Sequence, residues 1–189
     1  MRVIAGKFRG RTLRAVRGLK VRPSSDRVKE SLFNILAPRI VDIRFLDLFA
    51  GTGSIGIEAL SRGVAEVVFV EQDRDALRCL KRNLEVCRLE LGFEVIQQPV
   101  ARALREMDAQ GRAFNMVFLD PPYQAALYSS TLDLLGAGNL VAADGWAIAE
   151  HDRRLELANG YGRLRRFRIQ RIGDTALSFY SGEAEEDDG

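Results

Sequence analysis

The residues best suited to chemistry are Asp120, Pro121, Pro122 and Tyr123, which directly follow the apolar run 116–119. Such a run predicts a buried strand, so the four residues would lie just past its end. The carboxylate accepts hydrogen bonds, Pro121 offers a carbonyl without an N–H, and Tyr123 offers a flat aromatic face. This set suits a planar group that carries an exocyclic amine, such as a nucleobase.

A glycine loop lies far upstream of this tetrad. It follows the apolar segment 45–49, which contains Asp47 and ends at Phe49, and it carries Gly51 and Gly53 ahead of a predicted helix. Glycines there let a ligand approach the backbone closely, and the N–H groups at a helix start favour an anionic group. The loop is therefore expected to bind a ligand.

A second apolar strand ends at Glu71, about 20 residues past the glycine loop. An acid at that place can hold the hydroxyls of a ribose. Together with the loop, it indicates that the cofactor is a nucleoside derivative.

Two cofactors fit this pattern. The spacing of Gly51, Gly53 and Gly56 matches the dinucleotide fingerprint, which would indicate a nicotinamide oxidoreductase. However, Asp47 would repel a pyrophosphate, whereas it can orient the ammonium or sulfonium end of S-adenosylmethionine. A nicotinamide enzyme also has no evident use for the tetrad at 120–123. Methyl transfer is therefore favoured, and cofactor binding distinguishes the two.

At this point the residues resemble a known family. Segments 47–54 and 120–123 look like the cofactor and catalytic motifs of Rossmann-like amino-methyltransferases that use S-adenosylmethionine. Segments 2–13 and 22–36 resemble the leading signatures of the RsmD family, and the similarity extends to about Tyr180. The resemblance implies methylation at N2 of one guanine, number 966 in the usual naming, in bacterial 16S ribosomal RNA.

The resemblance implies roles for particular residues. Asp120 and the Pro121 carbonyl would accept hydrogen bonds from the guanine N2 hydrogens, while Tyr123 would stack on a flipped-out base and Pro122 would contact RNA. The residues expected to bind the cofactor are Asp47, Phe49, Gly51, Gly53, Glu71 and, on the resemblance alone, Asp26, with Arg22 and Arg27 nearby.

The chain departs from the family pattern at two places. Ser24 stands where Thr is expected, which keeps the hydroxyl. After the third predicted strand, Gln97, Gln98 and Pro99 stand where an acid often contacts adenine, so adenine recognition there is left unassigned.

Two further alternatives remain open. The tetrad also serves methylation of adenine N6 in DNA or RNA, because adenine too has an exocyclic amine. The second alternative is a non-catalytic RNA-binding assembly factor on the same fold. The intact glycine loop and the intact tetrad disfavour it.

The charge distribution indicates a phosphate-rich partner. Residues 1–29 hold ten Lys or Arg and one acid, Asp26. Such a basic arm fits RNA, and the expected partner is 16S rRNA, either naked or within a small ribosomal subunit or assembly intermediate. The candidate phosphate contacts are Arg2, Lys7, Arg9, Arg11 and Arg14. The bases of segment 163–168 are expected to form a solvated strand face instead.

Composition and length predict one domain of moderate size in the cytoplasm. The chain has 189 residues, of which 47% are hydrophobic, and no apolar run approaches the roughly 18 residues of a membrane span. Cys79 and Cys87 are expected to pack in the core, and His151 to be structural, so no metal is expected. No feature demands a partner copy, so a monomer is expected.

Strands and helices are predicted to alternate, which indicates an α/β fold with a mostly parallel sheet covered on both faces. The expected class is the Rossmann-like class I methyltransferase fold, seven-stranded and closed by an antiparallel hairpin that turns at Gly173-Asp174. Residues 1–43 would form a basic extension with a hairpin and a helix starting at Asp26, residues 44–181 the methyltransferase domain, and residues 182–189 an acidic disordered tail. Strands are predicted at 45–49, 66–71, 93–97, 115–119 and 144–150, and helices at 54–62, 74–89, 100–108 and 125–135.

Overall fold

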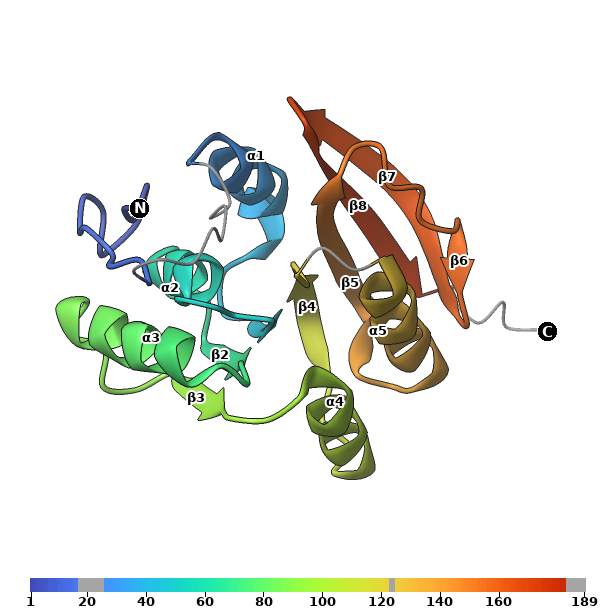
Figure 1. Ribbon diagram of the computed structural model, residues 1–189, viewed down its shortest axis with the longest axis horizontal. Coiled ribbons are helices and arrows are strands. Elements are labelled where there is room, and N and C mark those ends of the chain that lie inside the picture. The colour runs from blue at the N-terminus through green and yellow to red at the C-terminus, as the bar shows by residue number, and fades with distance from the viewer. Residues whose placement is uncertain (17–25, 123–124, 183–189) are drawn as a thin grey trace.

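The computed structural model describes residues 1–16, 26–122 and 125–182. Its central feature is a sheet of eight strands in the order β3-β2-β1-β4-β5-β8-β7-β6 (Figure 1). The first five of these pair in parallel, and β8, β7 and β6 add antiparallel to that half. The strands are β1 Arg44–Leu48, β2 Glu66–Val70, β3 Phe93–Ile96, β4 Phe114–Leu119, β5 Val141–Asp152, β6 Gly160–Tyr161, β7 Leu164–Ile172 and β8 Thr175–Gly182.

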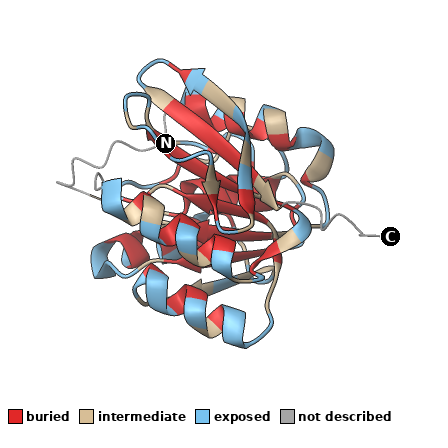
Figure 2. Ribbon diagram, turned by 90° about the vertical axis from the view of Figure 1, so that its right-hand side faces the viewer, coloured by how far each residue is buried: buried red, intermediate tan, exposed pale blue. Residues whose placement is uncertain are grey.

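Five α-helices cover the two faces of this sheet. They are α1 Asp26–Leu36, α2 Ser54–Ser61, α3 Arg74–Val86, α4 Val100–Ala109 and α5 Ala125–Ala137, and a short 3-10 helix, Ala37–Arg39, continues α1. Side chains of α1, α2 and α3 share one hydrophobic core with one face of the sheet, whereas α4 and α5 share a second core with the other face. Figure 2 shows the buried strands between helices whose outer faces are exposed.

Alternation along the strands explains these two layers. In β1, for example, Phe45 belongs to the first core and Leu46 and Leu48 to the second. Strands buried on both faces read as near-continuous apolar runs, as β2 and β4 do. The carboxyl ends of the parallel strands therefore meet at one edge, which is where ligands bind in such sheets.

The expected fold class is confirmed, with corrections in detail. The sheet has eight strands rather than seven, because the two-residue β6 pairs with the start of β7. The hairpin of β7 and β8 turns at Gly173-Asp174 as expected. Near the N-terminus, the predicted hairpin is reduced to a single antiparallel bridge between Arg2 and Thr12.

In the described residues, α2 and α1 begin where the sequence predicts them, at residues 54 and 26. Gly53, with a φ of 78°, is the cap of α2, and Ser54 is its first helical residue rather than its cap. Asp26 likewise is the first residue of α1 and not a cap. Gly63 follows Arg62, the C-cap of α2, with a φ of 99°, a conformation that glycine adopts without strain.

None of the helices in the described ranges is both long and apolar enough to cross a membrane. Of the predicted acidic tail, residues 182–189, Gly182 ends β8 and residues 183–189 lie outside those ranges.

Candidate active site

The carboxyl edge of the parallel strands brings together the predicted acids of β1, β2 and β4. The register places Leu48 beside Val70 on one side and beside Leu119 on the other. Glu71 and Asp120 each follow one of those neighbours directly, so they lie at the same edge as the glycine loop.

Asp47 is buried beneath the loop, with 2% of its surface exposed. Its Oδ2 accepts a hydrogen bond of 2.9 Å from the N–H of Gly56, in the first turn of α2. Burial raises the pKa of this carboxyl to about 7, the Gly56 bond opposes that rise, and the charge of Glu71 adds to it. The direct partner of Asp47 is therefore the start of α2.

The backbone of the loop after β1 adopts positive φ angles at several residues, which a ligand site would explain. Phe49, which is half-buried, has a φ of 58°, and Gly51 and Gly53 also have positive φ. A non-glycine residue in this region is strained, and such strain gathers at functional sites. A Cβ on Gly53 would lie 2.1 Å from a side-chain carbon of Leu80 on α3, so only glycine fits there.

Glu71 connects this loop to the end of β2. One carboxylate oxygen accepts a hydrogen bond of 2.8 Å from the Gly51 N–H, and the other accepts bonds of 2.8 Å from the N–H groups of Gln72 and Asp73. A carboxylate has about four acceptor sites, so it keeps capacity for a ligand hydroxyl. The loop and the acid thus form one hydrogen-bonded unit.

Asp120 is half-buried at the end of β4. Burial raises the pKa of its carboxyl well above the ordinary value, and the nearby charges of Glu150 and Asp47 raise it further. The acids at this edge therefore repel one another when ionised, and a cation that bound there would lower this repulsion and favour their charged forms.

Two residues that sequence reasoning missed lie behind the tetrad. Glu150 is 7% exposed in β5, and the register of Leu119 with Ala149 places it beside Asp120. The hydroxyl of Tyr128, from α5, donates to the backbone oxygen of Glu150 at 2.9 Å and lies 3.5 Å from the Pro121 oxygen. An acid at a strand end was the available signal for Glu150, whereas nothing in the sequence marked Tyr128.

The rest of the tetrad is described only in part. Pro121 is buried and Pro122 is exposed, which fits a role for Pro122 on the outer surface. Tyr123 lies outside the described residues, and so does Arg22, so their predicted roles stay predictions.

The N-terminal arm, residues 1–16, packs against α2 and α3 (Figure 1). The N–H groups of Ile4 and Ala5 donate to the Glu58 carboxylate at 2.8 and 3.0 Å, and the N–H of Phe8 donates to the Ser61 hydroxyl. A Cβ on Gly6 would lie 1.8 Å from the Ser61 oxygen, so glycine is needed for this close contact. The arm is thus fixed on the domain.

A buried ion pair completes this attachment. The Lys29 ammonium of α1 lies 3.5 Å from the Glu58 carboxylate of α2, and both side chains are almost wholly buried. Lys29 also donates to the Arg2 backbone oxygen at 2.6 Å, and Arg62 donates to Glu58 at 2.9 Å. Burial lowers the pKa of Lys29, while the Glu58 charge opposes that change. No sequence pattern had indicated this pair.

The structure places the predicted RNA contacts of the arm on its outer side. Arg2, Lys7, Arg9 and Arg14 are exposed, whereas Arg11 is half-buried and donates to the Val86 oxygen at the end of α3. Asp26, predicted near the cofactor, forms an exposed ion pair of 3.5 Å with Arg2.

The remaining polar candidates have structural partners. His151 is buried, and its ring nitrogens lie 2.8 Å from the Asp152 oxygen and 2.9 Å from the Ser178 hydroxyl. Both cysteines are buried and unpaired, as expected. Gln98 donates to Glu106 at 3.0 Å. Within the described residues no cluster of metal-ligating side chains is found.

The fold and the site together define a class. A parallel sheet closed by an antiparallel hairpin, with a glycine loop after its first strand and acids at its carboxyl edge, is the architecture of Rossmann-like methyltransferases.

The particular family follows from comparison with known proteins. Residues 1–181 match the family described as conserved hypothetical protein 95, and the chain belongs to this family, the RsmD family that its N-terminal signatures indicate. Ribosomal RNA small subunit methyltransferase D of Escherichia coli strain K12 is 35% identical, over 98% of this chain and 91% of that protein. YlbH of Bacillus subtilis strain 168 is 41% identical, over 95% and 98% respectively.

A solved structure supports the same assignment. The structure of yhhF from Escherichia coli superposes with a TM-score of 0.85 at 34% identity, and covers 98% of this chain and 99% of that one. The N-terminal arm therefore belongs to the shared architecture rather than to an addition in this chain.

Proposed function

We propose that this protein transfers the methyl group of S-adenosylmethionine to the exocyclic N2 of one guanine in small-subunit ribosomal RNA. The observation that carries this proposal is the acidic carboxyl edge, where Asp47, Asp120 and Glu150 gather beside a glycine loop. A sulfonium cofactor suits that edge, whereas the pyrophosphate of a dinucleotide would be repelled.

The residues present fit such a cofactor. Gly51 and Gly53 would let it approach the backbone, and Glu71 would hold its ribose hydroxyls with its remaining acceptor capacity. Asp47 would act on the methionine end indirectly, by fixing the start of α2. When bound, S-adenosylmethionine supplies an electrophilic methyl group on a positively charged sulfur.

Asp120 and Pro121 would prepare the acceptor nitrogen. The guanine N2 lone pair is delocalised into the ring, so the amine is a poor nucleophile. Hydrogen bonds from its two hydrogens to the Asp120 carboxylate and the Pro121 carbonyl would favour a tetrahedral nitrogen and direct its lone pair at the methyl group. Tyr128, 3.5 Å from the Pro121 oxygen, would help to hold that carbonyl in place.

Stacking and charge would position the RNA. The target base must be unpaired or flipped out before it can meet the methyl group, and Tyr123 would stack on it. Pro122 would contact the RNA beside the flipped-out nucleotide. The exposed Lys and Arg side chains of the arm would contact phosphates. The names of the curated relatives support small-subunit ribosomal RNA as the substrate.

Transfer of labelled methyl groups tests this proposal. The protein would be incubated with methyl-labelled S-adenosylmethionine and unmodified small ribosomal subunits, naked 16S rRNA or duplex DNA. We expect label in ribosomal RNA as N2-methylguanosine, and more from whichever RNA form presents the base correctly. Label in N6-methyladenine would replace the proposed target with adenine, and binding of a nicotinamide cofactor without transfer would contradict the proposed chemistry.

A further inference from the structure

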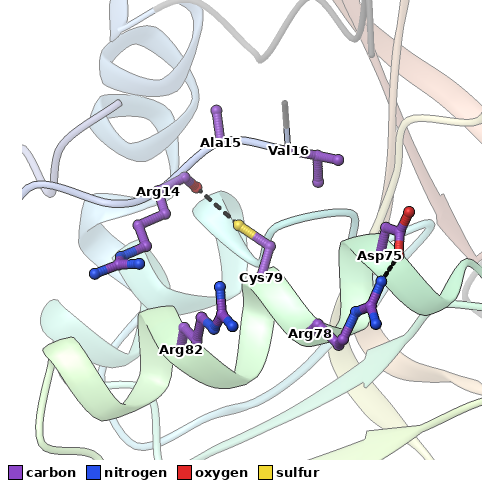
Figure 3. Close-up of a pocket in the computed structure, with 7 residues that line it drawn as sticks. All are labelled: Arg14, Ala15, Val16, Asp75, Arg78, Cys79 and Arg82. Carbon is purple, nitrogen blue, oxygen red and sulfur yellow. Dashed lines mark hydrogen bonds and ion pairs between the residues drawn. The ribbon is translucent and has the colours of Figure 1, made fainter. Parts of the chain in front are cut away.

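A cavity of about 700 Å³ lies between the end of the N-terminal arm and the outer side of α3 (Figure 3). Residues of both elements line it, and three of them are arginines. The lining residues are Arg14, Ala15 and Val16 of the arm and Asp75, Arg78, Cys79 and Arg82 of α3.

The charges of this cavity are not balanced by the protein. Arg14 and Arg82 form no ion pair with any acid in the described part of the chain, whereas Arg78 pairs with Asp75. Three cations and one acid leave a net charge of +2 around the opening. The guanidinium groups of Arg14 and Arg82 lie near Cys79. Burial raises the pKa of the Cys79 thiol, and these two charges oppose that rise.

The wall of the cavity is rigidly held. The backbone N–H of Arg14 donates to the Asn83 amide oxygen at 2.7 Å, and the Asn83 amide nitrogen donates to the Arg14 oxygen at 3.1 Å. The Cys79 thiol lies 3.2 Å from that same oxygen, as the dashed line in Figure 3 shows. A held backbone keeps the Arg14 side chain at the mouth of the cavity.

The arm and α3 both carry more basic than acidic residues. Residues 1–16 carry five basic residues and no acid, and α3 carries four bases and two acids. On α3, Arg78 and Arg82 are four residues apart and therefore project from the same side of the helix. Basic residues of the arm and of α3 therefore lie beside one another at this cavity.

We propose that Arg14, Arg78 and Arg82 bind neighbouring backbone phosphates of the RNA substrate along this cavity. Guanidinium groups bind phosphate oxygens through paired hydrogen bonds, and in Figure 3 the three groups point in different directions along the cavity, which suits neighbouring phosphates rather than a single one. The Asp75 pair keeps Arg78 oriented and neutralises the one acid that would repel the anion. This inference rests on the proposed function for the identity of the anion, and it adds α3 to the RNA-binding surface.

The test compares RNA binding by matched arginine variants. Arg78→Gln, Arg82→Gln and the double variant would be titrated with a fluorescent single-stranded RNA over a range of salt concentrations. Arg105→Gln is the control, because Arg105 is also an exposed helical arginine but lies on α4, whose buried side packs into the other core. Thermal unfolding and S-adenosylmethionine binding would establish that each variant is folded.

Each lost phosphate contact should lower the slope of log affinity against log salt by about one, and weaken binding for all RNA sequences alike. We expect a decrease of about two for the double variant and none for the control, with cofactor affinity unchanged. A double variant with the slope of the control would overturn the proposed phosphate site. The proposed function fails separately, if the wild-type protein binds RNA with the expected slope but transfers no methyl group to it.

Discussion

At the scale of single residues, the two acids with the most perturbed environments have different roles. Asp47 is buried and fully engaged with α2, whereas Asp120 is half-buried and faces the edge where a substrate can reach it. Perturbed acids gather at functional sites, and here the difference in access separates a supporting residue from one that can touch the substrate.

Asp120→Ala should abolish methyl transfer and leave cofactor affinity almost unchanged. The variant loses the hydrogen-bond acceptor for the target amine but keeps the glycine loop and Glu71. Transfer kinetics and calorimetric binding of S-adenosylmethionine measure the two effects. Unchanged turnover would refute the proposed alignment of the amine.

Tyr123→Ala should lose much activity, whereas Tyr123→Phe should lose little. Stacking of a base on an aromatic ring contributes roughly 1–3 kcal/mol, and phenylalanine keeps the ring. Turnover of both variants on the same RNA decides the matter. If the two substitutions were equally damaging, the hydroxyl rather than the ring would matter.

Asp47→Asn should alter how stability depends on pH. The pKa of Asp47 is about 7 in the folded protein and near 3.8 ordinarily, so the folded state holds this proton more tightly. Its contribution to stability is therefore complete below about pH 4 and is lost as the pH rises to about 7.

Asparagine cannot titrate but still accepts the Gly56 hydrogen bond, so the variant should gain stability relative to wild type across that range. The expected gain is on the order of a few kcal/mol. Urea unfolding of both proteins without cofactor measures it. Parallel pH profiles would show that Asp47 does not carry this linkage.

At the scale of elements, Glu58 joins the arm, α1 and α2 at one buried point. It accepts hydrogen bonds from two arm N–H groups and pairs with Lys29 and Arg62. Removing one partner of a buried pair leaves the other charge uncompensated, which is more costly than replacing both.

Glu58→Gln should therefore destabilise the protein by about 3–5 kcal/mol, because Lys29 stays buried without its counter-ion. Lys29→Met should cost less, since Glu58 keeps Arg62 and the two arm N–H groups. Denaturant unfolding compares the variants. Equal losses for the two substitutions would contradict this account of the pair.

The sequence predicted the elements better than their contacts. Apolar runs and glycines located every helix and parallel strand to within a few residues, because burial and backbone freedom are local properties of the chain. The two-residue β6 was missed because so short a strand leaves no periodic pattern. Glu58 was missed for a different reason: its partners in the arm and in α1 are brought to it only by the tertiary fold.

In the candidate site too, residues with a local sequence signal were predicted, whereas contacts that depend on tertiary packing were not. Asp47, Glu71 and Asp120 were predictable because each follows or ends an apolar strand, and strand ends meet at one edge. The contact between Tyr128 and the tetrad depends on how α5 packs, and the α3 arginines lie beside Arg14 only because the fold packs the arm against α3.

At the scale of the whole molecule, the two proposed binding surfaces differ in charge. The carboxyl edge gathers acids whose mutual repulsion a cationic cofactor would relieve, whereas the arm and α3 carry basic residues that suit RNA phosphates. The arm is bound to α2 and α3 by hydrogen bonds, so the two surfaces keep a fixed relation to each other.

RNA binding should depend steeply on salt. If about six phosphates contact the arm and α3, affinity should fall roughly 10³-fold between 50 and 200 mM salt. Fluorescence titration with 16S rRNA fragments measures this change. A flat salt dependence would count against the basic surface as the RNA-binding face.

The most direct test of the central claim is the identity of the nucleoside that the protein methylates. Unmodified small subunits and naked 16S rRNA would be treated with wild-type protein or with Asp120→Ala, digested, and analysed by mass spectrometry. The proposed mechanism predicts N2-methylguanosine at a single site from the wild-type protein and none from the variant. N2-methylguanosine from both proteins, or a methyl group on adenine or on ribose, would contradict it.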